Sequence, residues 1–214
     1  MQSVYSVRDT FAERDGAFMA LIIEGVTKRF GDNTVLDNIN AVFEDSGITC
    51  VMGESGVGKT TLMRIIMGLE KPDAGRVDGS GRVSAVFQED RLIEDISAVE
   101  NVMLVLGRGA RKLAESELGL LLDASSLYQA VSELSGGMRR RVCLVRAMLK
   151  ESDTLILDEP FTGMDEATKA RAIEYIKTRR QGRTCVVVTH QREDAQALGA
   201  RICLLTRAEA VATI

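Results

Sequence analysis

Short apolar runs recur along the chain and alternate with segments whose apolar residues are spaced as on one face of a helix. Runs typical of strands occupy residues 21–23, 39–43, 48–52, 83–87, 154–157, 185–189 and 202–205. Segments with helical spacing occupy residues 59–67, 142–149 and 170–176. Strands that alternate with helices in this way predict an α/β fold around a mainly parallel sheet.

The remaining segments indicate how the chain is organised. Residues 97–133 carry no strand pattern, and we expect a short helical insert there. The glycine-containing segment at residues 78–81 is typical of a turn between two strands. Regular patterning begins close to residue 19, so we interpret residues 1–18 as a loose N-terminal extension, open to disorder, and residues 19–214 as one folded domain.

The composition argues against several classes of function. Residues 1–18 contain charged side chains and no apolar core of the kind that secretory signals have. The apolar run at residues 102–106 is far shorter than the roughly 20 residues that a membrane-spanning helix needs. The net charge of −4 argues against a dedicated nucleic-acid surface, and we interpret the basic cluster at residues 139–141 as a solvated helix face. We therefore expect a chain that neither crosses a membrane nor binds nucleic acid.

The cysteines are interpreted as buried, reduced thiols. They lie far apart in the sequence, no C-x-x-C pair is present, and most of them fall within strand-like apolar runs. Such a distribution does not suit a metal site or a redox pair and is typical of a cytosolic protein. The residues concerned are Cys50, Cys143, Cys185 and Cys203.

A glycine-rich segment between a predicted strand and a predicted helix carries the strongest functional signal. It matches the pattern G-x-x-x-x-G-K-[ST] in the context that the pattern requires, and it reads Gly53-Glu54-Ser55-Gly56-Val57-Gly58-Lys59-Thr60. Its glycines allow backbone N–H groups to point inward around phosphates without obstruction by side chains. Lys59 would supply charge to the β- and γ-phosphates of a nucleotide, and Thr60 a hydroxyl ligand to magnesium. The alternative is a chance glycine-rich turn.

Two adjacent carboxylates follow the apolar run at residues 154–157. A strand in that position would deliver Asp158 to the magnesium ion beside the phosphates. Glu159 would then lie near the γ-phosphate, where a carboxylate can orient and deprotonate an attacking water. The alternative is a chance Asp-Glu turn after a buried strand, and the phosphate loop in the same chain favours the catalytic interpretation.

Two further polar residues lie at the ends of predicted strands. His190 is the only histidine and follows the run at residues 185–189, and Gln88 follows the run at residues 83–87. Because ligands gather at the carboxyl ends of strands in parallel α/β sheets, His190 is placed to hydrogen-bond a γ-phosphate. Gln88 is placed to reach magnesium or water through its amide. For both residues, a structural or solvated role is the alternative.

A second helix start offers another site for an anion. The run Leu-Ser-Gly-Gly-Met at residues 134–138 lies shortly upstream of the carboxylate pair. Helix N-termini expose unpaired backbone N–H groups and a partial positive charge, so each favours a phosphate. Alone, the run would be an ordinary turn and helix start. Beside a phosphate loop, it indicates a second contact to a nucleotide that is already bound.

Taken in order, these segments resemble the nucleotide-binding subunit of ABC transporters, and nearly the whole chain from about residue 20 takes part. The residues that carry the resemblance are the phosphate loop at 53–60, Gln88, the run at 134–138, Asp158, Glu159, Asp165 and His190. The segments at residues 86–92 and 99–102 look most like importer-type members that serve small anions, sulfonates or vitamins. The resemblance implies a P-loop NTPase core with a mainly parallel sheet, an N-terminal antiparallel β subdomain and the short helical insert.

The resemblance also implies roles for individual residues. Phe30 would be the aromatic platform for adenine, with a core phenylalanine as the alternative. Asp165 would lie at the subunit interface, and helix capping is a role that fits it as well. The implied catalytic residues are Glu159, His190, Lys59 and Gln88, and the implied magnesium ligands are Thr60, Gln88 and Asp158. The implied nucleotide-binding residues are Phe30, Gly53, Glu54, Ser55, Gly56, Val57, Gly58, Lys59, Thr60, Thr61, Ser135, Gly136, Gly137 and Asp165.

Family members are ATPases that require Mg²⁺ and work as head-to-tail pairs. The resemblance therefore implies ATP and Mg²⁺ as ligands and a second ATP-binding subunit as partner, most simply another copy of this chain. It implies a membrane-spanning permease that this chain energises from the cytoplasmic face as a peripheral subunit, and it allows an extracytoplasmic solute-binding protein. The alternative is a soluble ABC-type ATPase of metal-cluster assembly or nucleic-acid metabolism. The solute is chosen by other subunits, so this sequence does not name it.

The resemblance further indicates where a membrane partner would bind. In relatives, the helical insert and the segment after Gln88 meet the permease. Leu92, Ile93 and Ile96 are therefore candidates for docking, and simple core packing is the alternative for all of them.

Overall fold

In a computed structural model of the protein, residues 20–107, 109–206 and 210–213 are described, and the predicted extension at residues 1–18 lies outside them. The strands are β1 (Leu21–Phe30), β2 (Asn33–Phe43), β3 (Ile48–Met52), β4 (Ala74–Asp78), β5 (Val83–Val86), β6 (Thr154–Asp158), β7 (Thr184–Val188), β8 (Arg201–Leu205) and β9 (Ala210–Thr213). The α-helices are α1 (Lys59–Ile66), α2 (Ala98–Leu106), α3 (Arg111–Leu118), α4 (Gly136–Leu149), α5 (Glu166–Arg179) and α6 (Arg192–Leu198). Within these residues, no helix combines the length and apolarity that a bilayer span requires.

The central sheet has the strand order β5-β6-β7-β3-β8-β9. The first five of these strands pair in parallel, and β9 joins the edge antiparallel to β8. Every residue of β6 and β7 is buried, which explains why these strands read as nearly unbroken apolar runs. The predicted α/β class with a mainly parallel sheet is confirmed.

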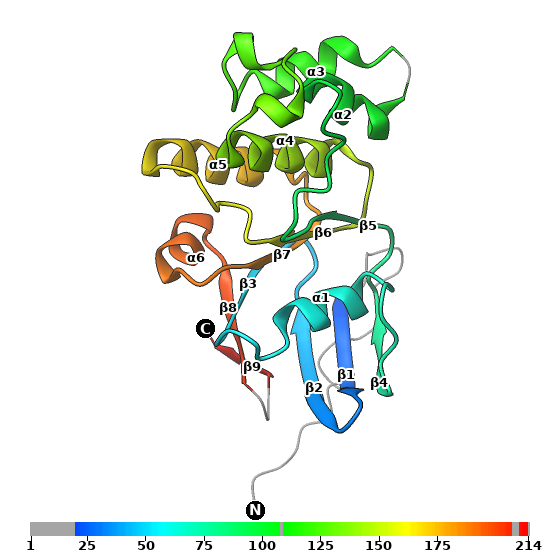
Figure 1. The fold of residues 1–214 in the computed structure, drawn as a ribbon. Coiled ribbons are helices and arrows are strands. Elements are labelled where there is room, and N and C mark those ends of the chain that lie inside the picture. The colour runs from blue at the N-terminus through cyan, green and yellow to red at the C-terminus, as the bar shows by residue number, and fades with distance from the viewer. Residues whose placement is uncertain (1–19, 108, 207–209, 214) are drawn as a thin grey trace, which may run out of the picture.

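Successive residues of a central strand face two different hydrophobic cores. On β6, Leu155 and Leu157 pack in one core with residues of the helices α2 to α6. Ile156, between them, packs in a second core with residues of α1, β1 and β2. The side-chain period of two therefore places a layer on each face of the sheet. Figure 1 shows α4 and α5 on one side of the sheet and α1 with the second sheet on the other.

The second sheet is antiparallel, with the order β2-β1-β4. β1 and β2 extend well beyond the predicted runs at residues 21–23 and 39–43, because polar side chains on their outer face hide the alternation. β4 and α6 were not predicted: β4 reads Ala-Gly-Arg-Val-Asp, and α6 is a short, mostly polar helix. The predicted turn at residues 78–81 does join two strands, β4 and β5, and these belong to different sheets.

The segment at residues 97–133 contains α2, α3 and two short 3₁₀ turns, Ala124–Ser126 and Val131–Glu133. A capping box begins α2: the Ser97 hydroxyl accepts from the Glu100 N–H at 3.2 Å, and the Glu100 carboxylate accepts from the Ser97 N–H at 2.9 Å. The buried Asn101 accepts from the Ile93 N–H and donates to the Ile93 carbonyl, both at 2.9 Å. The insert is thereby fastened to the loop that follows Gln88.

The cysteines are free and buried, as predicted. Burial raises the pKa of Cys50, Cys143 and Cys185 to about 12 and that of Cys203 to about 11. Their thiols therefore stay protonated at neutral pH and act as small apolar side chains.

Candidate functional site

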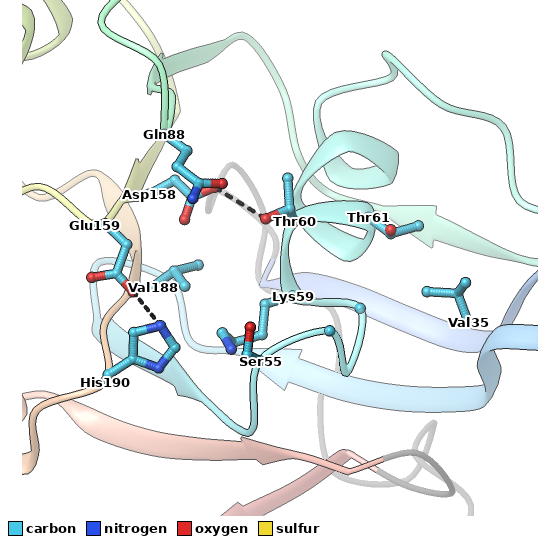
Figure 2. Close-up of a pocket in the computed structure, with 12 residues that line it drawn as sticks. Val35, Ser55, Lys59, Thr60, Thr61, Gln88, Asp158, Glu159, Val188 and His190 are labelled. Atoms are coloured by element: carbon cyan, nitrogen blue, oxygen red, sulfur yellow. Dashed lines mark hydrogen bonds and ion pairs between the residues drawn. The ribbon is translucent and has the colours of Figure 1, made fainter.

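The strands of the central sheet end at a pocket of about 260 Å³. β6, β7 and β3 are parallel neighbours, so the residues that follow them meet at one edge of the sheet. Figure 2 shows side chains of the glycine-rich loop facing those that follow β5, β6 and β7. The pocket is lined by Val35, Ser55, Gly56, Gly58, Lys59, Thr60, Thr61, Gln88, Asp158, Glu159, Val188 and His190.

The loop between β3 and α1 holds a lysine over its own backbone. Gly56 and Gly58 have φ angles of +77° and +106°, a region that favours glycine. Lys59 Nζ donates hydrogen bonds to the carbonyl oxygens of Gly53, at 2.8 Å, and Glu54, at 2.9 Å. Burial lowers the pKa of Lys59, and the negative charges across the pocket oppose that shift. The ammonium group is thus held where it would meet phosphate oxygens.

Asp158 ends β6 and lies opposite the first turn of α1. Thr60 Oγ1 is 3.5 Å from Asp158 Oδ2, and Gln88 points toward the same place (Figure 2). Burial raises the pKa of Asp158, and the positive charges of Arg140 and Lys59 act against that shift. In the part of the chain that the structure describes, no three His, Cys, Asp or Glu side chains form a cluster able to hold a metal. The oxygen donors present fit Mg²⁺, which completes its coordination with phosphates and water.

Glu159 has the features of a base beside the phosphates. Its φ of +49° is a strained value for a residue other than glycine, and its N–H donates to the Val188 carbonyl at 3.0 Å. Glu159 Oε1 lies 2.9 Å from His190 Nε2 (Figure 2), yet this buried oxygen has no aligned hydrogen-bond partner among the described residues. Burial raises the pKa of Glu159, and the nearby His190 lowers it. The carboxylate therefore lines the pocket beside His190, where it can accept a hydrogen bond from an incoming O–H group.

The Ser-Gly-Gly helix start does not contribute to the lining of this pocket. Ser135 is the N-cap of α4, and its hydroxyl accepts from the Met138 N–H at 3.3 Å. Ser135 and Gly136 are exposed, so this helix start is open to solvent. One chain thus carries both predicted anion sites without bringing them together.

The start of α4 packs against the loop that leads into α5. A Cβ on Gly137 would lie closer than 3.0 Å to the Gly163 carbonyl oxygen, so the two backbones can approach only without a side chain. Two residues after Gly163, Asp165 caps α5: its Oδ1 accepts from the Thr168 N–H at 2.7 Å. The predicted capping role of Asp165 is confirmed, and Asp165 itself lies outside the pocket lining.

Phe30 lies at the end of β1 and is 50% exposed. The alternative interpretation of Phe30 as a core residue is therefore wrong, because β1 runs beyond the core before it turns. Lys28 Nζ lies 5.2 Å from the centre of the Phe30 ring. Half of Phe30 is therefore exposed at the end of the strand, with Lys28 over its ring.

The interpretation of residues 139–141 as a solvated helix face is also wrong. Arg140 is only 3% exposed, and Arg139 and Arg141 are half-buried. This part of α4 packs over the carboxyl ends of β5 and β6, where the carbonyl groups of Phe87, Asp158 and Glu159 accept hydrogen bonds from Arg140. A run of three arginines gives no sign of this, because the acceptors come from distant parts of the sequence.

The pocket lining also includes Val35 and Val188, which are not among the predicted site residues. Val188 is the last residue of β7. Because ligands gather at the carboxyl ends of parallel strands, its position in the sequence is consistent with a place in the pocket. Val35 comes from β2 in the other sheet, and no pattern in the sequence indicates it. The predicted nucleotide-binding residues outside the pocket lining are Phe30, Gly53, Glu54, Val57, Ser135, Gly136, Gly137 and Asp165.

The sequence model of the ABC transporter family matches residues 36–162 of this chain. The chain is 39% identical over 197 residues to an aliphatic sulfonates import ATP-binding protein from Burkholderia lata. The matched region covers 87% of this chain and 61% of the relative. The chain is 41% identical over 200 residues to a protein of the same name from Rhodococcus jostii, covering 88% of this chain and 80% of the relative. The chain thus spans less than two thirds of the Burkholderia relative.

Two solved structures resemble this fold along most of the chain. One is the dimeric structure of a bacterial ABC transporter cassette, with a TM-score of 0.79 and 30% identity, covering 89% of this chain and 96% of that chain. The other is the dimeric post-hydrolysis state of an ATP-binding cassette bound to ADP and phosphate. It has a TM-score of 0.79 and 29% identity, with the same coverage.

Gly137→Ala tests the close approach of α4 to the neighbouring loop. We expect it to lower the free energy of unfolding by about 1–3 kcal/mol, because the new Cβ would overlap the Gly163 carbonyl oxygen. Gly136→Ala is the matched control, since a Cβ there meets nothing within 4 Å. It should leave the stability unchanged or raise it by up to about 1 kcal/mol. Urea unfolding measures both, and equal stabilities for the two variants would contradict the packing.

Proposed function

Since this chain belongs to the ABC transporter family, we propose that it is an ATP-hydrolysing subunit that energises the transport of a small solute through a separate membrane-spanning permease. The observation that carries the proposal is a single pocket lined by Lys59, Asp158, Glu159 and His190. The names of the relatives from Burkholderia and Rhodococcus support import as the direction and sulfonates as the first solute class to test. Selection of the solute rests with the membrane partner.

ATP would bind with its phosphates in the glycine-rich loop. Lys59, now bonded to carbonyl oxygens of that loop, would exchange these bonds for bonds to the β- and γ-phosphates. Phe30, half exposed at the end of β1, would stack on the adenine. Thr60, Asp158 and Gln88 would hold Mg²⁺, which when bound neutralises charge on the β- and γ-phosphate oxygens.

Glu159 would accept a proton from the water that attacks the γ-phosphate. Its raised pKa makes it a better proton acceptor than an exposed carboxylate, and it lines the pocket together with Lys59. His190, which lies 2.9 Å from Glu159 Oε1 before ATP binds, would donate from its imidazole to a γ-phosphate oxygen once ATP is bound. These groups are fixed before the reaction, so little reorganisation is needed when charge develops.

A second subunit would complete each site. Ser135, Gly136 and Gly137 would contact the γ-phosphate of the ATP that is held by the other copy, and Asp165 would lie at the interface. The open helix start outside this chain's own pocket supports that arrangement, as does the dimeric state of the similar cassettes. A two-fold pair satisfies both anion sites twice. Loss of the γ-phosphate would remove the group that bridges the halves, and the halves would part.

The permease would dock in a groove of about 250 Å³ between the end of α1, β5 and α2. Leu69, which lines the groove, is 50% exposed. Ile93 and Leu104 do not line it and are 49% and 58% exposed. Leu92, by contrast, packs against the core, and Ile96 is half-buried. Ile93 is therefore the member of the predicted docking set that remains available to a partner.

Glu159→Gln tests the catalytic assignment. Because glutamine keeps the shape of the side chain and cannot accept the proton, we expect ATP turnover to fall by about a hundredfold or more. ATP affinity should persist, and a nucleotide-bound dimer should accumulate. Steady-state phosphate release, equilibrium ATP binding and light scattering measure the three properties.

The control is Glu174→Gln on the exposed face of α5, which should leave turnover at the wild-type level. Full turnover in the Glu159 variant would overturn the mechanism. Lost turnover together with lost ATP affinity would show that Glu159 acts in binding and would contradict its assignment as the base.

Purification of the full chain from its native membrane tests the transport role. We expect a membrane-spanning protein to co-purify and to be lost on Leu69→Asp, because a charge at the groove would be buried against the partner. Ala170→Asp, on the exposed side of α5 and away from both the groove and the helical insert, is the control and should retain the partner. Recovery of soluble partners alone would favour a soluble ATPase of metal-cluster assembly or nucleic-acid metabolism.

A further inference from the structure

Arg140 is a buried cation that contacts the active-site backbone without lining the pocket. It lies on α4, in the second turn after Ser135. Its Nε donates to the Glu159 carbonyl oxygen at 2.9 Å, and its Nη2 donates to the Asp158 carbonyl oxygen at 2.6 Å. The guanidinium group therefore holds the backbone on which both pocket carboxylates are carried.

The same side chain also reaches the loop that carries Gln88. Its Nη1 donates to the Phe87 carbonyl oxygen and lies 3.3 Å from Asp90 Oδ1. The positions bonded to Arg140 are separated from it by 18 to 53 residues of sequence. One side chain on the Ser-Gly-Gly helix thus joins the segments on both sides of Gln88 to the end of β6.

We propose that Arg140 is a positioning residue that couples the start of α4 to Glu159 and Gln88 of the same chain. The inference rests on the proposed function, in which Ser135 of one copy contacts the ATP held by the other copy. Contact at Ser135 would then be transmitted through α4 and Arg140 to the carboxylate that acts on the chain's own ATP. Arg140 would in this way link the two ATP sites of the pair.

The chemistry of arginine suits this task. Its planar group presents several N–H donors in a fixed fork, so it can hold three backbone carbonyls in one relative arrangement. Lysine offers a compact charge on a flexible stem and cannot reproduce that fork. Glu159 also has a positive φ, a strained conformation that persists only where its surroundings fix it, and the bond from Arg140 to its carbonyl oxygen is such a restraint.

Arg183 provides a matched control within the same chain. Its guanidinium group also joins separate elements through carbonyl oxygens, those of Met148 at 2.9 Å and Arg179 at 2.8 Å. These bonds lie at the C-terminal ends of α4 and α5, at the opposite edge of the sheet from the pocket. Arg183→Gln therefore removes a comparable set of bonds without touching the segments that carry Glu159 or Gln88.

The test uses the full chain with Arg140→Gln, Arg140→Lys and Arg183→Gln. For both Arg140 variants we expect ATP affinity to stay within about twofold and kcat to fall by roughly tenfold or more, as for a misplaced catalytic group. The Hill coefficient for ATP hydrolysis should fall toward one, because the link between the sites is broken. Arg183→Gln should lower thermal stability and keep the wild-type kcat and Hill coefficient.

Wild-type kcat and cooperativity in the Arg140 variants would overturn the inference while leaving the proposed function intact. An equal loss of kcat in the Arg183 variant would also overturn it, since the effect would then be general destabilisation. If Arg140→Gln does not fold, Arg140→Lys decides between these outcomes because it retains the buried charge. Absence of ATPase activity in the wild-type chain would overturn the proposed function itself.

Discussion

Two adjacent carboxylates at the end of a fully buried strand impose the constraint on which the rest of this structure depends. Burial raises the pKa of Asp158 and Glu159, because both lose hydration that only nearby cations and donors can replace. Lys59 faces them across the pocket, and Arg140 holds their backbone from the side of α4. Bound Mg²⁺ with a nucleotide would add positive charge beside these carboxylates. The cost of burying the two carboxylates in the empty pocket would therefore favour binding of Mg²⁺ and the nucleotide.

A second constraint is geometric, because one fold does not enclose a phosphate between its two anion sites. The phosphate loop lines the pocket, whereas Ser135 begins a helix that is open to solvent elsewhere. The contact between Gly137 and Gly163 and the bonds of Arg140 tie that helix start to the end of β6. In the proposed pair, α4 would thus link the site that a subunit holds to the site that it completes in its partner.

The sequence predicts those parts of the fold and the pocket whose place in the folded chain is reflected in the pattern of apolar and polar residues along the segment itself. β6 and β7 are buried on both faces, so they appear as apolar runs, and the residues after parallel neighbours necessarily meet at one edge. β4 has too little apolar surface to be recognised alone and forms through its pairing with β1. The burial of Arg140 and the approach of Val35 depend on segments brought together only in the folded chain, so no local pattern indicates them.

The central claim is that each ATP is shared between the phosphate loop of one copy and the helix start of the other. Mixing two inactive variants tests it most directly. Lys59→Ala removes the phosphate-binding lysine of the loop, and Ser135→Arg blocks the helix start. Both variants also carry Glu159→Gln, so that bound ATP is not hydrolysed. Neither variant alone should form an ATP-bound dimer, and the mixture should form one that retains ATP at its one intact site. A mixture that retains no more ATP than the separate variants would contradict the account.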